Sequence, residues 1–231
     1  MQGSAAHFHL LNRCRTISRD GCQTNSVAWV RDEEERMAIN PETQWTPAEY
    51  LAFERAQCDA KHEYLDGRIL PMAETIRGMA GASVAHNRIV SNLVISLGTQ
   101  MRGRPCDVFS GDMRIHIPAT GLYTYPDVVA LCDAPQFEDA QLDVLLNPSV
   151  IIEVLSPSTE AYDRGAKFDH YRSIETLLTY VLIAQDNIHV ERFQRQENGW
   201  LLTVAKQLEA RVRLDAIGCV LALADVYTRV L

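Results

Sequence analysis

The segment from Pro148 to Ser156 constrains the fold of this chain more than any other segment. It is a continuously apolar run interrupted by one acid, Glu153. A run of this length, rich in β-branched residues and bounded by prolines, is typical of a strand buried on both faces. An unpaired carboxylate costs several kcal/mol in such a place. The sequence therefore predicts that Glu153 has a partner or a chemical role.

A second acid lies in a similar setting. Asp127 is the one charged residue of the apolar segment 125–131, which also reads as a strand. Two lone carboxylates on neighbouring strands can be held together at neutral pH by a divalent cation that they share. We therefore expect Asp127 and Glu153 to lie close together and to bind a metal ion.

The composition is that of an ordinary globular protein, with 231 residues of which 47% are hydrophobic and 23% charged. No apolar run approaches the ~18 residues of a membrane span, and the first residues lack a signal-peptide pattern. We expect a cytoplasmic protein without membrane association. The net charge of −8 counts against a non-specific DNA-coating protein, which needs a basic face. It counts less against an enzyme that uses a metal and a few local basic residues.

The six cysteines are scattered without a C-x-x-C pair or a nearby group of histidines. This spacing argues against a zinc site and against a disulfide framework, so we expect reduced cysteines with structural roles. A hydrolase that uses a cysteine and a histidine also lacks supporting spacing.

Residues 1–36 differ from the rest because they are polar and have neither a helical nor a strand period. Such a segment is typical of a disordered extension, and residues 37–231 then form a single domain. Two interpretations stay open: a genuine flexible tail, or an over-read segment upstream of a true start at Met37.

The remaining chain alternates between helix and strand signals. A capping box at Thr46–Glu49 with proline at the first helical position predicts a helix over 47–58, and Asp66-Gly67 predicts a hairpin over 63–70. The spacing of apolar residues predicts a long helix over 83–101. Strict alternation over 113–117 predicts a half-exposed strand. Further expected elements are a loop over 133–147, a helix over 162–174, strands at 179–184, 188–194 and 200–204, and an apolar tail over 214–231 that docks on the body. This order predicts an α/β fold, a mixed sheet flanked by helices.

The helix expected at 162–174 carries a second chemical signal. Asp163, Lys167 and Tyr171 are spaced by four and share one helix face. If the helix packs over the sheet, the Lys167 ammonium group can reach the two acids, orient an attacking water or neutralise a transition state. The alternative is a solvated Asp163–Lys167 pair on the surface.

Three motifs together resemble a known family. They are Pro126-Asp127, the stretch Glu153-Val-Leu-Ser-Pro-Ser-Thr159, and Asp163-Arg-Gly-x-Lys167-x-x-x-Tyr171. As a set they are similar to the Uma family of restriction-endonuclease-like proteins, a branch of the PD-(D/E)XK nuclease superfamily. The resemblance extends from about Thr46 to Tyr227. It implies an αβββαβ core with an added β meander.

The resemblance also implies site residues. Asp127 and Glu153 correspond to the two acids that bind the metal. We expect the backbone carbonyl of Val154 to be a further ligand. The superfamily lysine two residues after the second acid is replaced here by Leu155, and Lys167 is the position that matches instead. Hard oxygen ligands favour Mg²⁺ or Mn²⁺ over zinc. The implied activity is metal-dependent hydrolysis of DNA phosphodiester bonds.

DNA is then the expected partner, and a second copy of the chain is a further candidate. The competing interpretation is a non-cleaving nucleic-acid-binding or accessory module on the same fold, which the acidic surface favours.

Three more residues are supporting candidates, each with a structural alternative. Glu63 resembles an additional acid near the metal, or it is a solvated hairpin residue. His86 contacts the scissile phosphate or caps the long helix. Asp112 hydrogen-bonds into the site or ends a turn. Ser156, Ser158 and Thr159 are expected mainly to form a loop and a helix N-cap, with phosphate contact as a secondary role.

Overall fold

A six-stranded mixed sheet positions the candidate site. The computed structural model describes residues 44–57, 60–72 and 82–231, and the strand order in this sheet is β11–β10–β9–β8–β6–β3. Only β8 and β9 run parallel to each other; the other neighbours are antiparallel. The strands are β3 (Asp107–Ser110), β6 (Val128–Leu131), β8 (Val150–Leu155), β9 (Thr179–Ala184), β10 (Val190–Gln196) and β11 (Gly199–Ala205).

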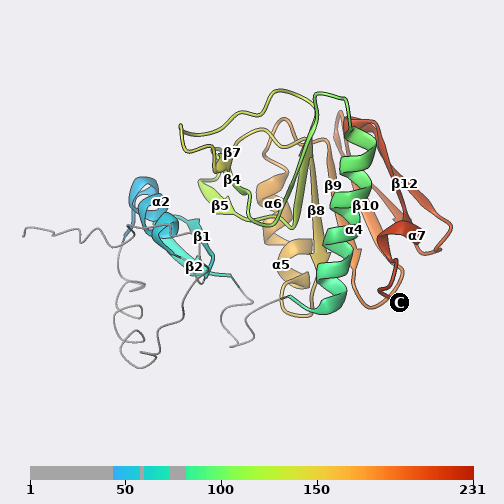
Figure 1. Ribbon diagram of the computed structural model, residues 1–231. Helices are drawn as coiled ribbons and strands as arrows, with labels where there is room; N and C mark the ends of the chain where they lie inside the picture. The colour runs from blue at the N-terminus through green and yellow to red at the C-terminus, as the bar shows by residue number, and fades with distance from the viewer. Residues whose placement is uncertain (1–43, 58–59, 73–81) are drawn as a thin grey trace, which may run out of the picture. The chain divides into compact units, whose positions relative to one another are not determined.

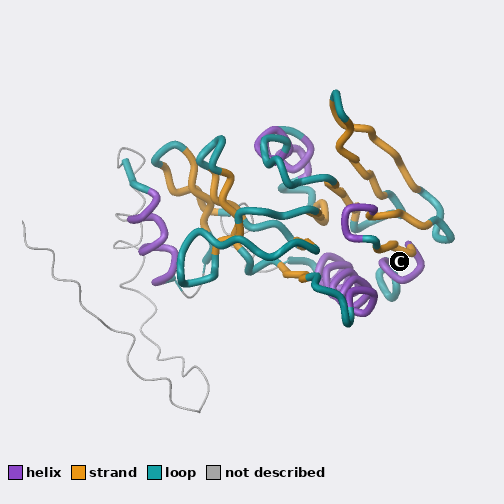
Figure 2. The backbone as a smooth tube through the Cα atoms, turned by 90° about the horizontal axis from the view of Figure 1, so that it is seen from above, coloured by secondary structure: helices purple, strands orange, loops and turns teal. Residues whose placement is uncertain are grey.

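Helices cover both faces of this sheet. The long helix α4 (Val84–Met101) lies on one face, and the short helices α5 (Glu160–Arg164) and α6 (Ala166–Tyr171) lie on the other (Figures 1 and 2). The predicted stripe of α4 is confirmed, since Ile89, Leu93, Leu97 and Met101 are all buried. The chain order α4, β3, β6, β8, α5/α6, β9 is the αβββαβ core that was expected.

The first strand of that core differs from the prediction. We expected 113–117 to precede the Asp127 strand in the sheet, but β3 at 107–110 holds that position. Residues 114–117 form β4 (Arg114–Ile117) in a second sheet, of order β2–β1–β5–β4–β7. The other strands of this sheet are β1 (His62–Leu65), β2 (Arg68–Pro71), β5 (Leu122–Thr124) and β7 (Val144–Leu145).

The predicted half-exposure of this strand is also wrong, because its polar side chains have partners inside. Arg114 is 5% exposed. Its guanidinium group donates to the Tyr125 hydroxyl over 2.8 Å and lies over the rings of Tyr50 and Tyr125. The His116 ring stacks on Tyr123 with centroids 3.9 Å apart. An alternating pattern therefore marks a strand here without marking an exposed face.

The amino-terminal elements of the second sheet follow the local signals. Helix α2 (Pro47–Ala56) begins with the predicted capping box, in which Thr46 and Glu49 bond reciprocally. The β1–β2 hairpin turns at Asp66-Gly67, where both residues have positive φ, 50° and 79°. This turn is of the kind that Asp-Gly favours, so the hairpin prediction is confirmed.

The helix predicted over 162–174 is split in two. Gly165 separates α5 from α6 with the non-helical angles φ −112° and ψ −104°. A Cβ at this position would lie 3.1 Å from the Ala161 carbonyl oxygen, so glycine permits the close turn.

The carboxyl-terminal tail docks as predicted. It forms β12 (Arg211–Leu214), a 3-10 turn (Asp215–Ile217), β13 (Cys219–Ala222) and α7 (Leu223–Val226). Leu214, Leu221 and Leu223 are fully buried in the cluster that includes the α4 stripe.

Cysteine pairing corrects another expectation. Cys106 and Cys132 form a disulfide, whereas we expected reduced cysteines. Cys106 directly precedes β3 and Cys132 directly follows β6, and the antiparallel register Asp107↔Leu131 brings them together. Strand pairing, which the spacing of the cysteines does not reveal, decides this contact. Cys219 is buried and free.

Residues 1–36, for which a disordered extension was predicted, lie outside the described residues. The described residues all belong to one compact unit. Among the described helices, none is both long and apolar enough to span a membrane.

Candidate active site

Asp127 and Glu153 face each other across two antiparallel strands. Asp127 comes directly before β6 and Glu153 lies within β8, and the register Val128↔Ile152 places the two acids opposite each other. The Asp127 N–H donates to Glu153 Oε2 over 3.2 Å, and the Val154 N–H donates to Asp127 Oδ2 over 2.7 Å. Each acid is therefore held by the backbone of the other strand.

The two acids differ in exposure. All six residues of β8 are buried, as the sequence predicted, and Glu153 is 3% exposed. The Asp127 side chain is 24% exposed. The site thus has an inner acid enclosed by protein and an outer acid that solvent and ligands can reach.

Lys167 is the main partner of the inner acid. Its Nζ lies 2.9 Å from Glu153 Oε1 and 3.5 Å from Asp163 Oδ1, and the three side chains are 4–5% exposed. A solvated surface pair of Asp163 and Lys167 is thereby ruled out. Asp163 and Lys167 still lie within 3.5 Å of each other, although Gly165 separates the helices α5 and α6 that carry them.

Tyrosine side chains surround Glu153, Asp163 and Lys167. Tyr171 donates its hydroxyl proton to Glu153 Oε1 over 2.8 Å, so this oxygen accepts from both Tyr171 and Lys167. Tyr180 donates to the Asp163 carbonyl oxygen over 2.9 Å. The Lys167 ammonium group also lies 5.9 Å from the ring centroids of Tyr162 and Tyr171. These contacts fix Glu153 and Lys167 in one geometry.

Two of the three supporting candidates, Glu63 and His86, contact residues of the site. Glu63 is 7% exposed and accepts hydrogen bonds from Thr124 and from Tyr162, the latter over 3.0 Å. It is therefore no solvated hairpin residue. His86 Nε2 lies 3.1 Å from Asp127 Oδ2, so the first turn of α4 contacts the outer acid.

Asp112 is not brought to this cluster. Its side chain is 91% exposed and pairs with Lys61, whose Nζ lies 2.5 Å away. Of the serines after β8, Ser156 accepts from the Thr159 N–H over 3.2 Å, as expected for a turn. Thr159 occupies the N-cap of α5 but makes no side-chain capping bond.

Negative charge exceeds positive charge in the cluster. Glu153, Asp163 and Glu63 all interact with the ammonium group of Lys167, and Asp127 adds a fourth negative charge next to Glu153. Burial raises the pKa of Glu153 to about 8, although Lys167 opposes the shift. Burial also raises the pKa of Asp163.

Burial acts on the pKa of Lys167 in the opposite direction, because a lysine is charged when it is protonated. Burial lowers the pKa of Lys167, but the carboxylates of Glu153 and Asp163 outweigh burial and hold the pKa well above its usual value. Lys167 therefore stays charged, and the excess of acids opposes full ionisation of the cluster unless another cation binds.

The donor set fits a hard divalent cation. Within the described residues no group of three or more His, Cys, Asp or Glu could enclose a metal ion. Mg²⁺ does not require such a cage, because it keeps several waters and binds through one or two carboxylates plus substrate phosphates. Asp127 Oδ1 accepts no hydrogen bond from any described residue, and Glu153 Oε2 accepts one, which leaves it a lone pair. Asp127 and Glu153 can thus supply oxygen ligands.

The hydrogen-bond donors of the site were largely missed by the sequence analysis. Tyr171 was placed on the Lys167 face by its spacing, but its bond to Glu153 was not foreseen. Tyr162 and Thr124 gave no local signal, because their contacts with Glu63 join residues 99 and 61 positions apart.

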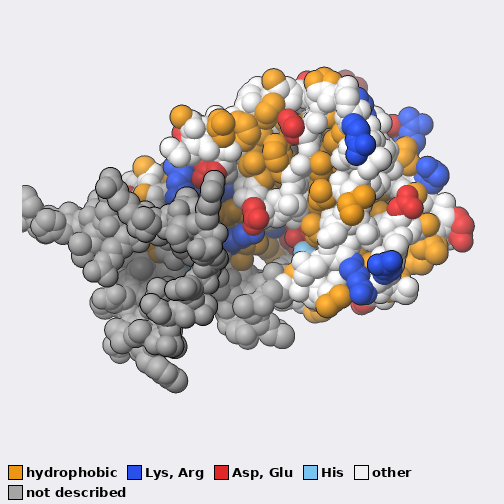
Figure 3. Space-filling view, viewed as in Figure 1, with side chains coloured by type: hydrophobic (Ala, Val, Ile, Leu, Met, Phe, Trp, Pro, Cys, Tyr) orange, Lys and Arg blue, Asp and Glu red, His pale blue; other side chains and the backbone are white. Residues whose placement is uncertain are grey.

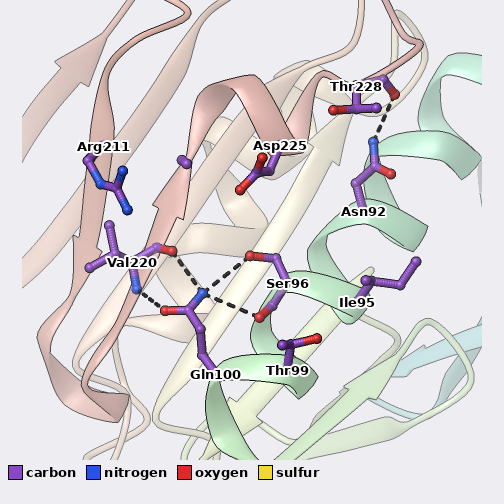
Figure 4. Close-up of a pocket in the computed structure, with 10 residues that line it drawn as sticks. Asn92, Ile95, Ser96, Thr99, Gln100, Arg211, Val220, Asp225 and Thr228 are labelled. Carbon is purple, nitrogen blue, oxygen red and sulfur yellow. Dashed lines mark hydrogen bonds between the residues drawn. The ribbon is translucent and has the colours of Figure 1, made fainter.

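A separate pocket of about 540 Å³ lies between α4 and the carboxyl-terminal segment (Figure 4). Gln100 crosses it to bond both backbone groups of Val220, and Asn92 donates to the Thr228 carbonyl oxygen. None of the candidate site residues lines this pocket. Its polar groups fasten the docked tail to α4.

The αβββαβ core and the facing acids define a restriction-endonuclease-like protein. The family model of Uma2, described as putative restriction endonuclease, matches residues 47–224, and the chain belongs to this family. The expected family and fold are therefore confirmed.

Two relatives and one solved structure are similar to this chain. Two uncharacterized proteins of Synechocystis sp. are similar to the chain. The protein sll1609 is 40% identical over 68% of this chain and 85% of its own length, and slr1290 is 34% identical over 79% and 90%. The crystal structure of a putative nuclease belonging to DUF820 from Anabaena variabilis has a TM-score of 0.63 at 19% identity, covering 80% of this chain and 98% of that one. This likeness supports the fold.

Proposed function

We propose that this protein is a Mg²⁺- or Mn²⁺-dependent endonuclease that hydrolyses DNA phosphodiester bonds. The observation that carries the proposal is the facing of Asp127 and Glu153 across β6 and β8, with Lys167 Nζ 2.9 Å from Glu153. Membership of a family described as putative restriction endonuclease supports a nuclease role.

Asp127 and Glu153 would hold the metal ion, with the Val154 carbonyl oxygen as a further proposed ligand. When bound, such an ion lowers the pKa of a coordinated water and polarises a phosphate oxygen. His86 restrains Asp127 from the side of α4, and Tyr171 restrains Glu153 from the side of α6. Both acids are thus held in place before a substrate arrives.

Lys167 would supply positive charge to the reaction. Its ammonium group can stabilise the negative charge that develops on the phosphate or orient the attacking water. In the present geometry that group contacts Glu153 and Asp163. A ligand that neutralises Glu153 weakens this attraction, so occupation of the acid pair would release Lys167 toward the substrate. Glu63 lies within electrostatic reach of Lys167 and would tune its position.

A second candidate function is a nucleic-acid-binding or accessory module that does not cleave. The net charge of −8 favours it. In the view of Figure 3, the Lys and Arg side chains of the described residues occur in small groups among neutral and acidic ones and form no continuous band. Such a surface binds DNA weakly without a local cation.

Cleavage assays on supercoiled plasmid and on single-stranded DNA, in Mg²⁺, in Mn²⁺ and in chelator, separate the two functions. The nuclease proposal predicts metal-dependent cleavage that Asp127→Asn and Glu153→Gln each abolish. Lys167→Ala should cut the rate by orders of magnitude while DNA binding stays nearly intact, because its interaction is made mainly in the transition state. Asp112→Asn is the matched acid control and should cleave almost normally. DNA binding without cleavage by the wild-type protein would support the accessory module instead.

A further inference from the structure

The outer strand β11 leaves an uncharged strand edge open. It pairs with β10 on one side, and no described strand pairs with its other side. The seven residues of β11 include no charged residue and no proline. Three large apolar side chains are about half exposed on it: Leu201 at 52%, Leu202 at 47% and Val204 at 49%.

Edge strands with free backbone groups tend to pair with other strands, and proteins usually protect them with charge, proline, a bulge or short length. The opposite edge of the same sheet has such protection, because β3 has four residues and begins with Asp107. By contrast, β11 pairs with β10 in an unbroken register over seven residues, without a bulge. The β11 edge therefore lacks the usual protection against pairing with another strand.

Identical strands can pair antiparallel around a two-fold axis, which closes the assembly at two chains. Charges at the two ends of β11 favour that arrangement. Glu197 lies two residues before the strand and Lys206 lies directly after it. Antiparallel self-pairing brings each Glu197 near Lys206 of the partner subunit, so opposite charges meet at both ends while the uncharged strand forms the centre.

We propose that two copies of this chain associate through β11, which pairs antiparallel with itself and joins the two six-stranded sheets into one. Leu202 is the middle residue of β11, so a centred register sets it opposite Leu202 of the partner subunit. The contact covers Leu201, Leu202 and Val204, which otherwise remain in water. This surface contains none of the candidate active-site residues, so the proposal does not depend on nuclease activity.

Sedimentation velocity of the full chain across a concentration series tests the interface. The wild-type protein should form a dimer, and Leu202→Lys should weaken the dimer by at least about 100-fold, because two like charges would meet on the axis. Ile95→Lys is the matched control, since Ile95 is 66% exposed and belongs to α4, not to β11. It should leave the dimer unchanged. Both replaced side chains are exposed, and the melting curves of the two variants should match that of the wild type.

A covalent test addresses the register. Leu202→Cys should give a disulfide-linked dimer under mild oxidation, and Ile95→Cys and the wild-type protein should not. A monomeric wild-type protein throughout the series, or a dimer that Leu202→Lys leaves intact, would overturn the proposal. A dimer in which Leu202→Cys fails to cross-link would place the contact elsewhere and equally reject the β11 interface.

Discussion

Lys167 Nζ lies 2.9 Å from Glu153 Oε1, and both side chains are about 95% buried, at 5% and 4% exposure. A buried ion pair is costly to break on one side, because removing either partner leaves an uncompensated charge inside the protein. The pair therefore contributes to the stability of the site as well as to its proposed chemistry.

We predict that Lys167→Met lowers the free energy of unfolding by about 3–5 kcal/mol at pH 9, where Glu153 is ionised. The loss should be smaller at pH 6, because Glu153, with a pKa of about 8, then takes up a proton. Urea unfolding at the two pH values measures the difference. Lys61→Met is the control: the Lys61 side chain is 42% exposed and pairs with Asp112, so the loss should stay below about 1 kcal/mol. Equal, small losses in both variants would contradict the buried pair.

Metal binding should depend on both facing acids. Calorimetric titration with Mn²⁺ should detect binding to the wild-type protein and none to Asp127→Asn or Glu153→Gln, because each substitution removes an anionic oxygen ligand. Asp112→Asn should bind Mn²⁺ like the wild type, since Asp112 is 91% exposed and pairs with Lys61. Unchanged affinity in both site variants would remove the metal from the proposed function.

Stability in chelator should fall as the pH rises. The folded-state pKa of Glu153, about 8, exceeds its ordinary value of 4.5, so the folded protein binds this proton more tightly than the unfolded chain does. The stabilisation is complete below about pH 4.5 and is lost as the pH rises through about 8. Between pH 4.5 and pH 8 the melting temperature of the wild-type protein should fall as the pH rises. Glu153→Gln should lack the part of this fall that comes from Glu153. A wild-type profile identical to that of Glu153→Gln would show that Glu153 does not titrate in this range.

The disulfide should stabilise the pairing of the edge strand β3 with β6. Cys106 and Cys132 are 26 positions apart, and closing a loop of that length stabilises a fold by up to about 3–4 kcal/mol through the unfolded chain. Reductant should therefore lower the melting temperature of the wild-type protein and leave that of Cys106→Ser unchanged. Mass spectrometry of unreduced peptides identifies the pair directly, and a free thiol at both positions would refute it.

Local signals in the sequence determined most of the elements. The capping box at Thr46 started α2, the spacing of four in α4 fixed its buried face, and Asp66-Gly67 placed the β1–β2 turn. These features depend on residues within a few positions of each other, so a pattern in the chain suffices to predict them. The lone acid in β8 also marked the site, because burial of a charge demands a partner wherever that partner comes from.

Only the tertiary structure decided which distant residues meet. The alternating segment at Arg114–Ile117 joined the second sheet, and β3 took its expected place, since sheet membership depends on long-range pairing that periodicity does not encode. The Cys106–Cys132 contact follows from the same register. Tyr162 and Thr124 reach Glu63 across 99 and 61 positions, and Asp112 turns away to Lys61. The sequence by itself determined the elements and the two acids, whereas the packing of the sheets decided their partners, because hydrogen bonds and ion pairs between distant segments exist only once those segments are packed together.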